Sequence, residues 1–321
     1  MWKRQLKKSI KHSQTYNMKK SFRHFLNLHE ISKEDINIIL KYSHRLKKNY
    51  KTKQLKEKKI LAIIFEKPST RTKISFDAGM KLLNGDVVTL DHSDSQLGRG
   101  ESLEDTMKVL SSYVDIIAYR GSDESKLYKL SEISTVPIIN GLTDISHPCQ
   151  IIADIMTLQE KFRSLNNLNL SWIGDGNNVC NSWIHASKHF DFNLKISCPS
   201  ENFPAKKILN SLNSGKVELF KNPLEAALDA DVIITDTWVS MGMKSNPKRL
   251  KNFEKFQINR DLLQKTGRKT YFLHCLPAHR GCEVTDEIID GENSLVWAEA
   301  CLLYTSPSPR DEQSSRMPSS A

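Results

Sequence analysis

The sequence predicts an α/β protein of two doubly wound parallel-sheet domains joined by a helix, with the active site in the cleft between the domains. Two observations lead to this prediction. From residue 60 onward, short apolar runs alternate with helical patterns of about 10–15 residues, which is typical of parallel sheets with helices on both faces. The chain is also 321 residues long, which is enough for two domains.

Four apolar runs before residue 147 and five after it are expected to form strands. They are rich in Ile, Val, Leu and aromatic residues and lie between polar segments, as buried strands do. The expected strands span residues 60–65, 86–90, 115–119, 136–140, 168–173, 194–198, 232–235, 271–273 and 295–297.

The segment HPCQIIADIMTLQEKF, residues 147–162, is expected to be the helix that joins the domains. His147 stands at its N-cap position and Pro148 at its first helical position, where proline is favoured. The two domains are then residues 22–150 and 151–300. Because ligands of open parallel sheets bind at the carboxyl ends of the strands, functional residues are expected there.

The composition is that of a soluble globular protein, with 39% hydrophobic and 26% charged residues. The sequence has no apolar run near the roughly 20 residues that a membrane helix needs. Its six cysteines form no C-x-x-C pair, so their spacing fits neither a zinc site nor a disulfide framework. These features predict a cytoplasmic protein with reduced cysteines and no membrane partner.

Most of the net charge of +10 belongs to an N-terminal arm, because residues 1–23 contribute +8 and contain no acid. An arm of this kind could contact RNA or anionic lipid, or could be an organellar presequence. It could also be a solvated, disordered extension at residues 1–21, or codons upstream of a true start at Met18. No aromatic stacking pattern accompanies the charge, so nucleic acid is not expected as a partner.

The final segment, residues 301–321, does not fit the α/β pattern. It is rich in Ser and Pro from Thr305 onward, which is typical of disorder. One permitted codon choice for CLLYTSPSPRD also reads like a transposon-type sequencing adapter. We therefore expect a non-native tail and a missing native C-terminus.

The stretch FEKPSTRTKISF, residues 65–76, follows a buried strand and opens a helix whose residues Ile74, Ala78 and Leu82 share one face. Its polar residues are Ser69, Thr70, Arg71 and Thr72. Backbone N–H groups at a helix start, hydroxyl groups and an Arg fork together form an anion cradle. The sequence has no P-loop pattern. The alternative is a capped helix with a solvated arginine.

Three more segments of the first half bring polar residues to strand ends. IIAYRG brings Arg120, and HPCQ brings His147 and Gln150, which share one face of a first helical turn. SDSQLGRGES offers Gln96 on a polar loop after a strand. His147 alone could be a structural cap, but together with two arginines it suggests a site.

In the second half, GDGNN at residues 174–178 partly resembles a dinucleotide fingerprint. Val179 stands where the third glycine would be, and no acid ends the next strand, so no nicotinamide cofactor is expected. Asn178 is interpreted as an amide that points into the cleft. The other candidates after strands are Asp236, Ser240 and Met241 in DTWVSMG and Cys275 and Leu276 in HCLP; Asp236 could instead be a cap and Cys275 plain packing.

The motifs STRT, YRG, HPCQ, GDGNN, DTWVSMG and HCLP occur in the order and approximate spacing of the ornithine carbamoyltransferases, which this chain resembles over residues 22–300. STRT and HPCQ belong to the wider carbamoyltransferase family, whereas DTWVSMG with HCLP is specific to the ornithine branch. The resemblance implies carbamoyl transfer from carbamoyl phosphate to L-ornithine, giving L-citrulline and phosphate in arginine biosynthesis. It implies no cofactor, no metal and a cytoplasmic homotrimer with shared active sites.

The resemblance also implies roles for individual residues. The 22–150 domain would bind carbamoyl phosphate and the 151–300 domain ornithine. Carbamoyl phosphate would be held by Ser69, Thr70, Arg71, Thr72, Gln96, Arg120, His147, Gln150, Cys275 and Leu276, with Gln96 reaching a neighbouring subunit's site. Ornithine would be held by Asn178, Asp236, Ser240 and Met241. The catalytic residues would be Arg120, His147 and Cys275.

Two positions depart from the family pattern. Lys73 stands where the family commonly has Arg, which keeps the charge but loses the bidentate fork. Leu303 stands where an arginine that contacts carbamoyl phosphate is expected, so the chain as written could be impaired. Two other functions remain open: a sister carbamoyltransferase that uses another amine, and an inactive paralogue that binds a partner through its basic arm.

Overall fold

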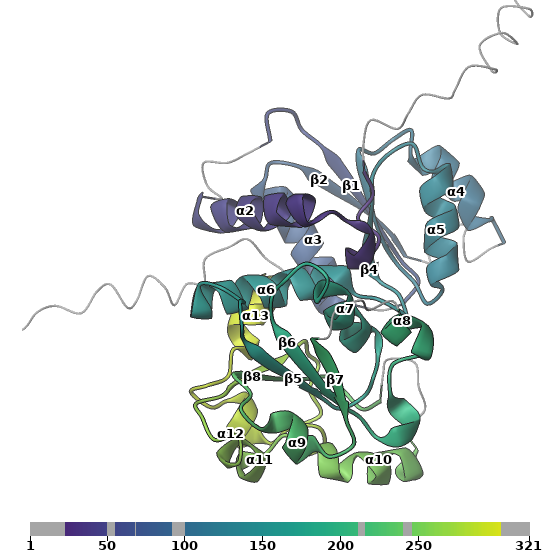
Figure 1. Cartoon of the computed structure of the whole chain (residues 1–321). Coiled ribbons are helices and arrows are strands. Elements are labelled where there is room, and N and C mark those ends of the chain that lie inside the picture. The colour runs from purple at the N-terminus through teal and green to yellow at the C-terminus, as the bar shows by residue number, and fades with distance from the viewer. Residues whose placement is uncertain are drawn as a thin grey trace, which may run out of the picture.

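The computed structural model describes residues 23–49, 55–67, 69–91, 100–210, 216–239 and 246–302 (Figure 1). These residues form one four-stranded and one five-stranded sheet, both parallel, with strand orders β2-β1-β3-β4 and β7-β6-β5-β8-β9. The predicted α/β fold is confirmed. Among the described helices, none has the length and apolarity needed to cross a membrane.

The first sheet is built from the N-terminal half of the chain. Its central strand β1, the sequence ILAIIF, is almost entirely buried, as expected for a strand covered on both faces. The elements are η1 (Leu28–Glu30), α2 (Lys33–Asn49), β1 (Ile60–Phe65), α3 (Thr70–Leu82), β2 (Asp86–Asp91), α4 (Leu103–Leu110), β3 (Ile116–Arg120), α5 (Glu124–Ile133) and β4 (Ile138–Leu142).

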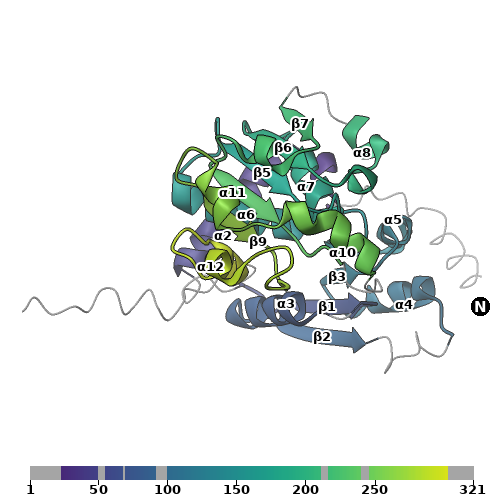
Figure 2. The ribbon, with the colours of Figure 1, turned by 90° about the horizontal axis from the view of Figure 1, so that it is seen from below.

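The second sheet follows helix α6 (Pro148–Phe162). Figure 2 shows the two sheets as separate layers of one chain. The elements are β5 (Asn169–Ile173), α7 (Asn178–Ala186), β6 (Asn193–Ser197), η3 (Ser200–Asn202), α8 (Lys206–Asn210), β7 (Val217–Phe220), α9 (Pro223–Ala227), β8 (Val232–Thr235), α10 (Pro247–Phe253), η4 (Glu254–Phe256), α11 (Arg260–Gln264), β9 (Tyr271–His274), α12 (Asp286–Ile289) and α13 (Val296–Leu302).

Helix α6 is the joining helix that the sequence predicts, with His147 at its N-cap and Pro148 at its first position. Its buried apolar residues, among them Ile151, Ile155 and Leu158, belong to one core cluster with Trp172 of β5 and Trp183 of α7. The helix therefore starts at the end of the first sheet and is anchored on the second. The proposed domain limits at residues 150 and 300 stay a prediction.

The expected strand at 295–297 is wrong, because α13 begins at Val296. Leu295 still donates its backbone N–H to the Phe272 carbonyl, but the chain then turns into a helix in which Glu299 N–H donates to the Leu295 carbonyl. The alanines and glutamate of VWAEA favour helix over strand. The fifth strand of the second sheet is instead β7, whose sequence VELF has two exposed residues and lacks the expected apolar run.

Candidate active site

Parallel pairing brings the ends of several strands together at the junction of the two sheets. In the first sheet, Phe65 pairs with Arg120, so Arg120 lies beside the segment that leads into α3. In the second sheet, Thr235 pairs with His274, so Asp236 and Cys275 follow side by side. The predicted position of the site at strand ends therefore has a direct cause in the strand register.

The first turn of α3 carries three of the predicted anion-binding residues. Ser69 is the N-cap residue, and its hydroxyl makes no capping hydrogen bond to the described part of the helix. Thr70, Arg71 and Thr72 follow in a first turn that contains no acid. The Nη1 of Arg120 donates to Thr72 Oγ1 at 3.3 Å, which joins β3 to this turn. The positive end of the helix and two guanidinium groups thus lie together, as an anion would require.

Arg120 is 6% exposed and links the two halves of the site. Burial and the nearby Arg71 charge lower the pKa of its guanidinium to about 10, and Cys275 acts in the opposite direction. The group therefore keeps its charge at neutral pH. Its buried Nε has no hydrogen-bond partner in the part of the chain that the structure describes, so a donor remains available to a ligand.

His147 is the N-cap residue of α6, but its side chain makes no capping hydrogen bond within the described residues. Its backbone N–H donates to Ser182 Oγ of α7 at 2.8 Å, and its buried Nδ1 has no partner among the described residues. Burial and the Arg120 charge lower the pKa of the imidazole to about 3. His147 is therefore neutral at physiological pH and offers one N–H donor rather than a positive charge.

Gln150 lies in the first turn of α6, three residues after His147, and is 3% exposed. Its Nε2 donates to Asp154 Oδ1 at 2.7 Å and to Glu299 Oε1 at 2.6 Å. The two carboxyl groups come from α6 and α13. Both hydrogen atoms of the amide are therefore used within the protein, and only the amide oxygen is free to accept a bond from a ligand.

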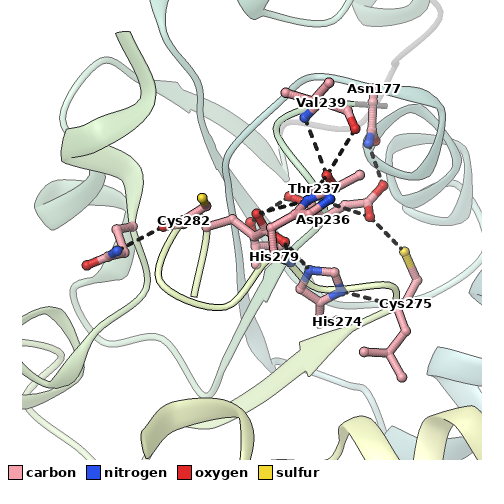
Figure 3. A network of polar contacts seen from close by, with 12 residues as sticks. Asn177, Asp236, Thr237, Val239, His274, Cys275, His279 and Cys282 are labelled. Carbon is pink, nitrogen blue, oxygen red and sulfur yellow. Dashed lines mark hydrogen bonds and ion pairs between the residues drawn. The ribbon is translucent and has the colours of Figure 1, made fainter. Parts of the chain in front are cut away.

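Asp236 and Cys275 form the centre of the second-domain half of the site (Figure 3). The carboxylate accepts hydrogen bonds from Cys275 Sγ at 3.1 Å, from Asn177 Nδ2 at 2.6 Å and from the Thr237 backbone N–H at 2.8 Å. Burial and the Asp236 charge raise the pKa of the Cys275 thiol well above its usual range. The thiol is therefore a neutral hydrogen-bond donor at physiological pH, not a thiolate.

A buried histidine supports the loop that carries Cys275. The ring Nε2 of His274 lies 3.3 Å from Glu283 Oε1, and the Leu276 backbone N–H donates to His274 Nδ1 at 2.9 Å. Leu276 has φ 56°, a left-handed conformation that is costly for a leucine. The contacts of His274 hold this backbone beside the site.

Asn178 does not simply point at a ligand: its Nδ2 donates to the Thr143 carbonyl at 2.7 Å, across the junction of the sheets. Its neighbour Asn177 contacts Asp236 and also caps α7 by accepting from the Val179 and Cys180 backbone N–H groups. Sequence reasoning missed Asn177, although an asparagine before a helix is a recognised cap signal. Glu283 and Glu299 were missed as well, because nothing local predicts that these glutamates are buried.

Three predicted site residues, Gln96, Ser240 and Met241, lie outside the described residues. Residues 1–22, which contain nearly all of the basic arm, and residues 303–321, which contain Leu303 and the rest of the tail, lie outside them too. A hollow of about 870 Å³ lies away from the predicted site, between α2, the C-terminal end of α6 and the loop after α7. None of the predicted site residues lines this hollow.

One group of side chains could hold a metal ion, because donor atoms of Asp236, His274 and Cys275 lie within 4.8 Å of one another. Binding would first require the thiol to lose its proton and its bond to Asp236. It would also compete with the hydrogen bonds that His274 makes through both ring nitrogens. The prediction of a metal-free site remains a prediction.

Two family models match the chain. Residues 23–160 match the carbamoyl-phosphate-binding domain of the aspartate/ornithine carbamoyltransferases, and residues 166–302 match their aspartate/ornithine-binding domain. An ornithine carbamoyltransferase of Mesorhizobium japonicum is 45% identical over 286 residues, which are 87% of this chain and 94% of the relative. One of Nitrobacter winogradskyi is 45% identical over 289 residues, covering 88% of this chain and 94% of that relative.

Solved structures agree with these sequence relatives. An ornithine carbamoyltransferase from Pyrococcus furiosus superposes with a TM-score of 0.83 at 41% identity, covering 88% of this chain and 94% of that one. An anabolic ornithine carbamoyltransferase from Campylobacter jejuni has a TM-score of 0.82 at 35% identity, covering 88% and 96% of the two chains. The similarity thus extends through both sheets.

The environment of His147 predicts how its imidazole titrates. In the folded protein the ring should stay neutral from pH 8 down to pH 5, because its pKa of about 3 lies far below the unfolded value of 6.5. Below pH 6.5 the unfolded chain binds a proton on this ring, whereas the folded protein does not. The buried neutral ring therefore contributes to folding stability above pH 6.5, and this contribution is lost as the pH falls towards 3. Imidazole ¹⁵N NMR, with the signal assigned by its absence in His147→Gln, checks the prediction; a midpoint near 6.5 would contradict it.

Proposed function

Because the chain belongs to the aspartate/ornithine carbamoyltransferase family, we propose that it transfers the carbamoyl group of carbamoyl phosphate to the side-chain amine of L-ornithine. The products are L-citrulline and phosphate. The observation that carries the proposal is Arg120, whose guanidinium donates to Thr72 Oγ1 at 3.3 Å and lies near Cys275, the thiol that donates to Asp236 at 3.1 Å. An anion-binding turn and an amine-binding carboxylate therefore belong to one site.

Carbamoyl phosphate binds with its phosphate at the start of α3. Ser69, Thr70 and Thr72 supply hydroxyl groups, the helix start supplies backbone N–H groups, and Arg71 supplies a planar fork of donors. The Nη1 contact of Arg120 with Thr72 brings a second guanidinium group to the same turn. Positive charge at this position stabilises the phosphate as it leaves.

The carbamoyl group lies towards Arg120, His147 and Gln150. Among the described residues, no group accepts from the Nε–H of Arg120, and none bonds to the buried Nδ1 of the neutral His147 ring. These groups polarise the carbonyl oxygen, where negative charge develops during attack. Because Gln150 has committed both amide hydrogens to carboxyl groups, it serves as an acceptor for the carbamoyl NH₂ group.

Ornithine binds on the second-domain side. The α-amino and α-carboxyl groups of the amino acid need opposite charges or dipoles, and Asp236 supplies the acceptor for an ammonium group. Asn178, Ser240 and Met241 complete the ornithine set, as the family resemblance implies. Cys275 and Leu276 lie where the two substrates meet, and the neutral thiol acts there as a hydrogen-bonding ligand.

The reaction forms a bond between the ornithine side-chain nitrogen and the carbamoyl carbon. The bond from that carbon to the phosphate oxygen breaks, its electron pair leaves with the phosphate, and the phosphate takes up the proton that the nitrogen loses. The amine must first be neutral, and for a lysine-like pKa near 10.4 this costs roughly 4–5 kcal/mol at neutral pH. The charges of Arg71 and Arg120 disfavour an ammonium group at the carbamoyl end of the site and so lower this cost.

We also propose a homotrimer in which Gln96 completes a neighbouring subunit's site. Ile74 of α3 is 51% exposed and Val88 of β2 is 45% exposed, so the first domain presents apolar side chains beside a strand that pairs only with β1 among the described residues. The reaction would serve arginine biosynthesis in the cytoplasm, as expected of the family.

Subunit mixing tests the shared site. Arg71→Ala and Gln96→Ala chains should each be inactive alone but regain up to about a quarter of the original activity after joint refolding, because each mixed trimer has one intact site. Unmixed samples carried through the same refolding are the control. If mixing restores nothing while both variants assemble, Gln96 does not act across subunits.

The phosphate cradle predicts the effect of losing the arginine fork. Arg71→Lys keeps the charge but not the bidentate geometry, so the KM for carbamoyl phosphate should rise about tenfold or more. Inhibition by inorganic phosphate should weaken by a similar factor, because the same groups hold it. Arg45→Lys on α2, where Arg45 lies 5.7 Å from the Tyr42 ring, is the matched control. If Arg71→Lys and Arg45→Lys have the same KM for carbamoyl phosphate and the same inhibition constant for phosphate, Arg71 does not hold the phosphate.

The acceptor assay decides the reaction itself. The purified 321-residue chain is given carbamoyl phosphate with ornithine, putrescine or aspartate, and carbamoylated product is measured. Ornithine should be preferred by about 100-fold or more, because Asp236 repels an acidic acceptor and would be left unpaired by an acceptor without an α-amino group. Preference for putrescine or aspartate would identify a sister enzyme, and no product with any acceptor would reject the proposed function for this chain.

A further inference from the structure

Glu299 and Asp154 hold the Gln150 amide between two carboxyl groups. All three side chains are buried, with exposures of 1%, 2% and 3%. The distances from Gln150 Nε2 are 2.6 Å to Glu299 Oε1 and 2.7 Å to Asp154 Oδ1. A flipped amide would turn its oxygen towards both carboxyl groups, which is unfavourable where either is ionised, so this pair fixes the orientation of Gln150.

The second oxygen of Glu299 reaches the other half of the site. Its Oε2 accepts from the His274 backbone N–H at 3.3 Å, at the end of β9 and next to Cys275. Helix α13 packs against both α6 and β9. One carboxyl group thus joins the amide on the carbamoyl phosphate side to the backbone that carries the thiol.

The charges around Glu299 keep it neutral. Two carboxyl groups act on Glu299: Asp154 of α6 and Asp236 at the end of β8. The His274 backbone N–H donates a hydrogen bond to Glu299, and the neighbouring Cys275 thiol is neutral. Burial and these carboxyl groups raise the pKa of Glu299 well above its usual range, and burial raises that of Asp154 to about 7. Glu299 and Asp154 share a hydrogen bond, in which protonated Glu299 is the donor and Asp154 is the acceptor.

We propose that Glu299 is a positioning residue, which orients the Gln150 amide for the carbamoyl group and fixes the His274–Cys275 backbone relative to it. The proposal rests on the proposed function. Glu299 touches neither reacting group; it acts through Gln150 and through the end of β9. Its loss should therefore disturb the carbamoyl end of the substrate and leave the phosphate end, held by α3, in place.

The test compares two constants in Glu299→Gln. The substituted amide cannot accept from both Gln150 and His274, because one of its two polar atoms becomes a donor. The KM for carbamoyl phosphate should rise on the order of tenfold, since a buried donor loses its acceptor. The inhibition constant of inorganic phosphate should stay as in the unmutated protein, because phosphate makes no use of Gln150.

The matched control is Glu292→Gln, the same chemical change at an exposed residue shortly before α13. It should leave both constants unchanged. The inference is overturned if Glu299→Gln behaves like this control, or if phosphate affinity and melting temperature fall together with activity, which marks a purely structural role. Should Glu299→Gln not fold, Asp154→Asn removes the carboxylate that receives the Glu299 proton and should show the same split between the two constants.

The unmutated chain keeps this test separate from that of the proposed function. If it forms no citrulline, the proposed function fails before any variant is measured. If it does form citrulline and neither Glu299→Gln nor Asp154→Asn separates carbamoyl phosphate from phosphate, only the positioning role is wrong.

Discussion

The rest of the site depends on the burial of α6. The helix starts at the carboxyl end of the first sheet, yet its apolar residues pack into the core of the second sheet with Trp172 and Trp183. Any rotation or shift of α6 would open that core, at a cost of several kcal/mol for each large side chain exposed. The same packing therefore fixes the positions of His147 and Gln150, which project from its first turn.

Charge divides the site into two unequal halves. The first-domain half has two guanidinium groups and a neutral imidazole, and no acid lies in the first turn of α3. The second-domain half contains the buried carboxyl groups of Asp154, Asp236 and Glu299, and no cation is among the groups that act on Asp154 and Glu299. This division matches a substrate pair in which the dianion binds in the first-domain half and the ammonium group in the second-domain half. In the opposite arrangement, each substrate would face protein groups of the same charge as its own.

The sequence predicted the parts of the fold and site that follow from local pattern. Buried strands such as 60–65, the capped start at His147 and the polar residues after strand ends all have short-range signals. The three-residue apolar run at 295–297 did not distinguish a strand from the first turn of α13, and β7 lacked a pattern because its VELF sequence is half exposed. Glu299 could not be predicted, since its partners lie 149 and 25 residues away in the chain.

Hydrogen bonding distinguishes the surroundings of the buried carboxyl groups of Asp236, Asp154 and Glu299. Asp236 accepts hydrogen bonds from an amide, a backbone N–H and a thiol. Asp154 and Glu299 instead share one proton while Gln150 donates to both. With one proton between them, Asp154 and Glu299 together carry one negative charge rather than two, which limits the charge buried beside Asp236. The Asp236 carboxyl group lies next to Cys275, where an amine substrate needs its acceptor, and neutral Glu299 fixes the His274 backbone beside it.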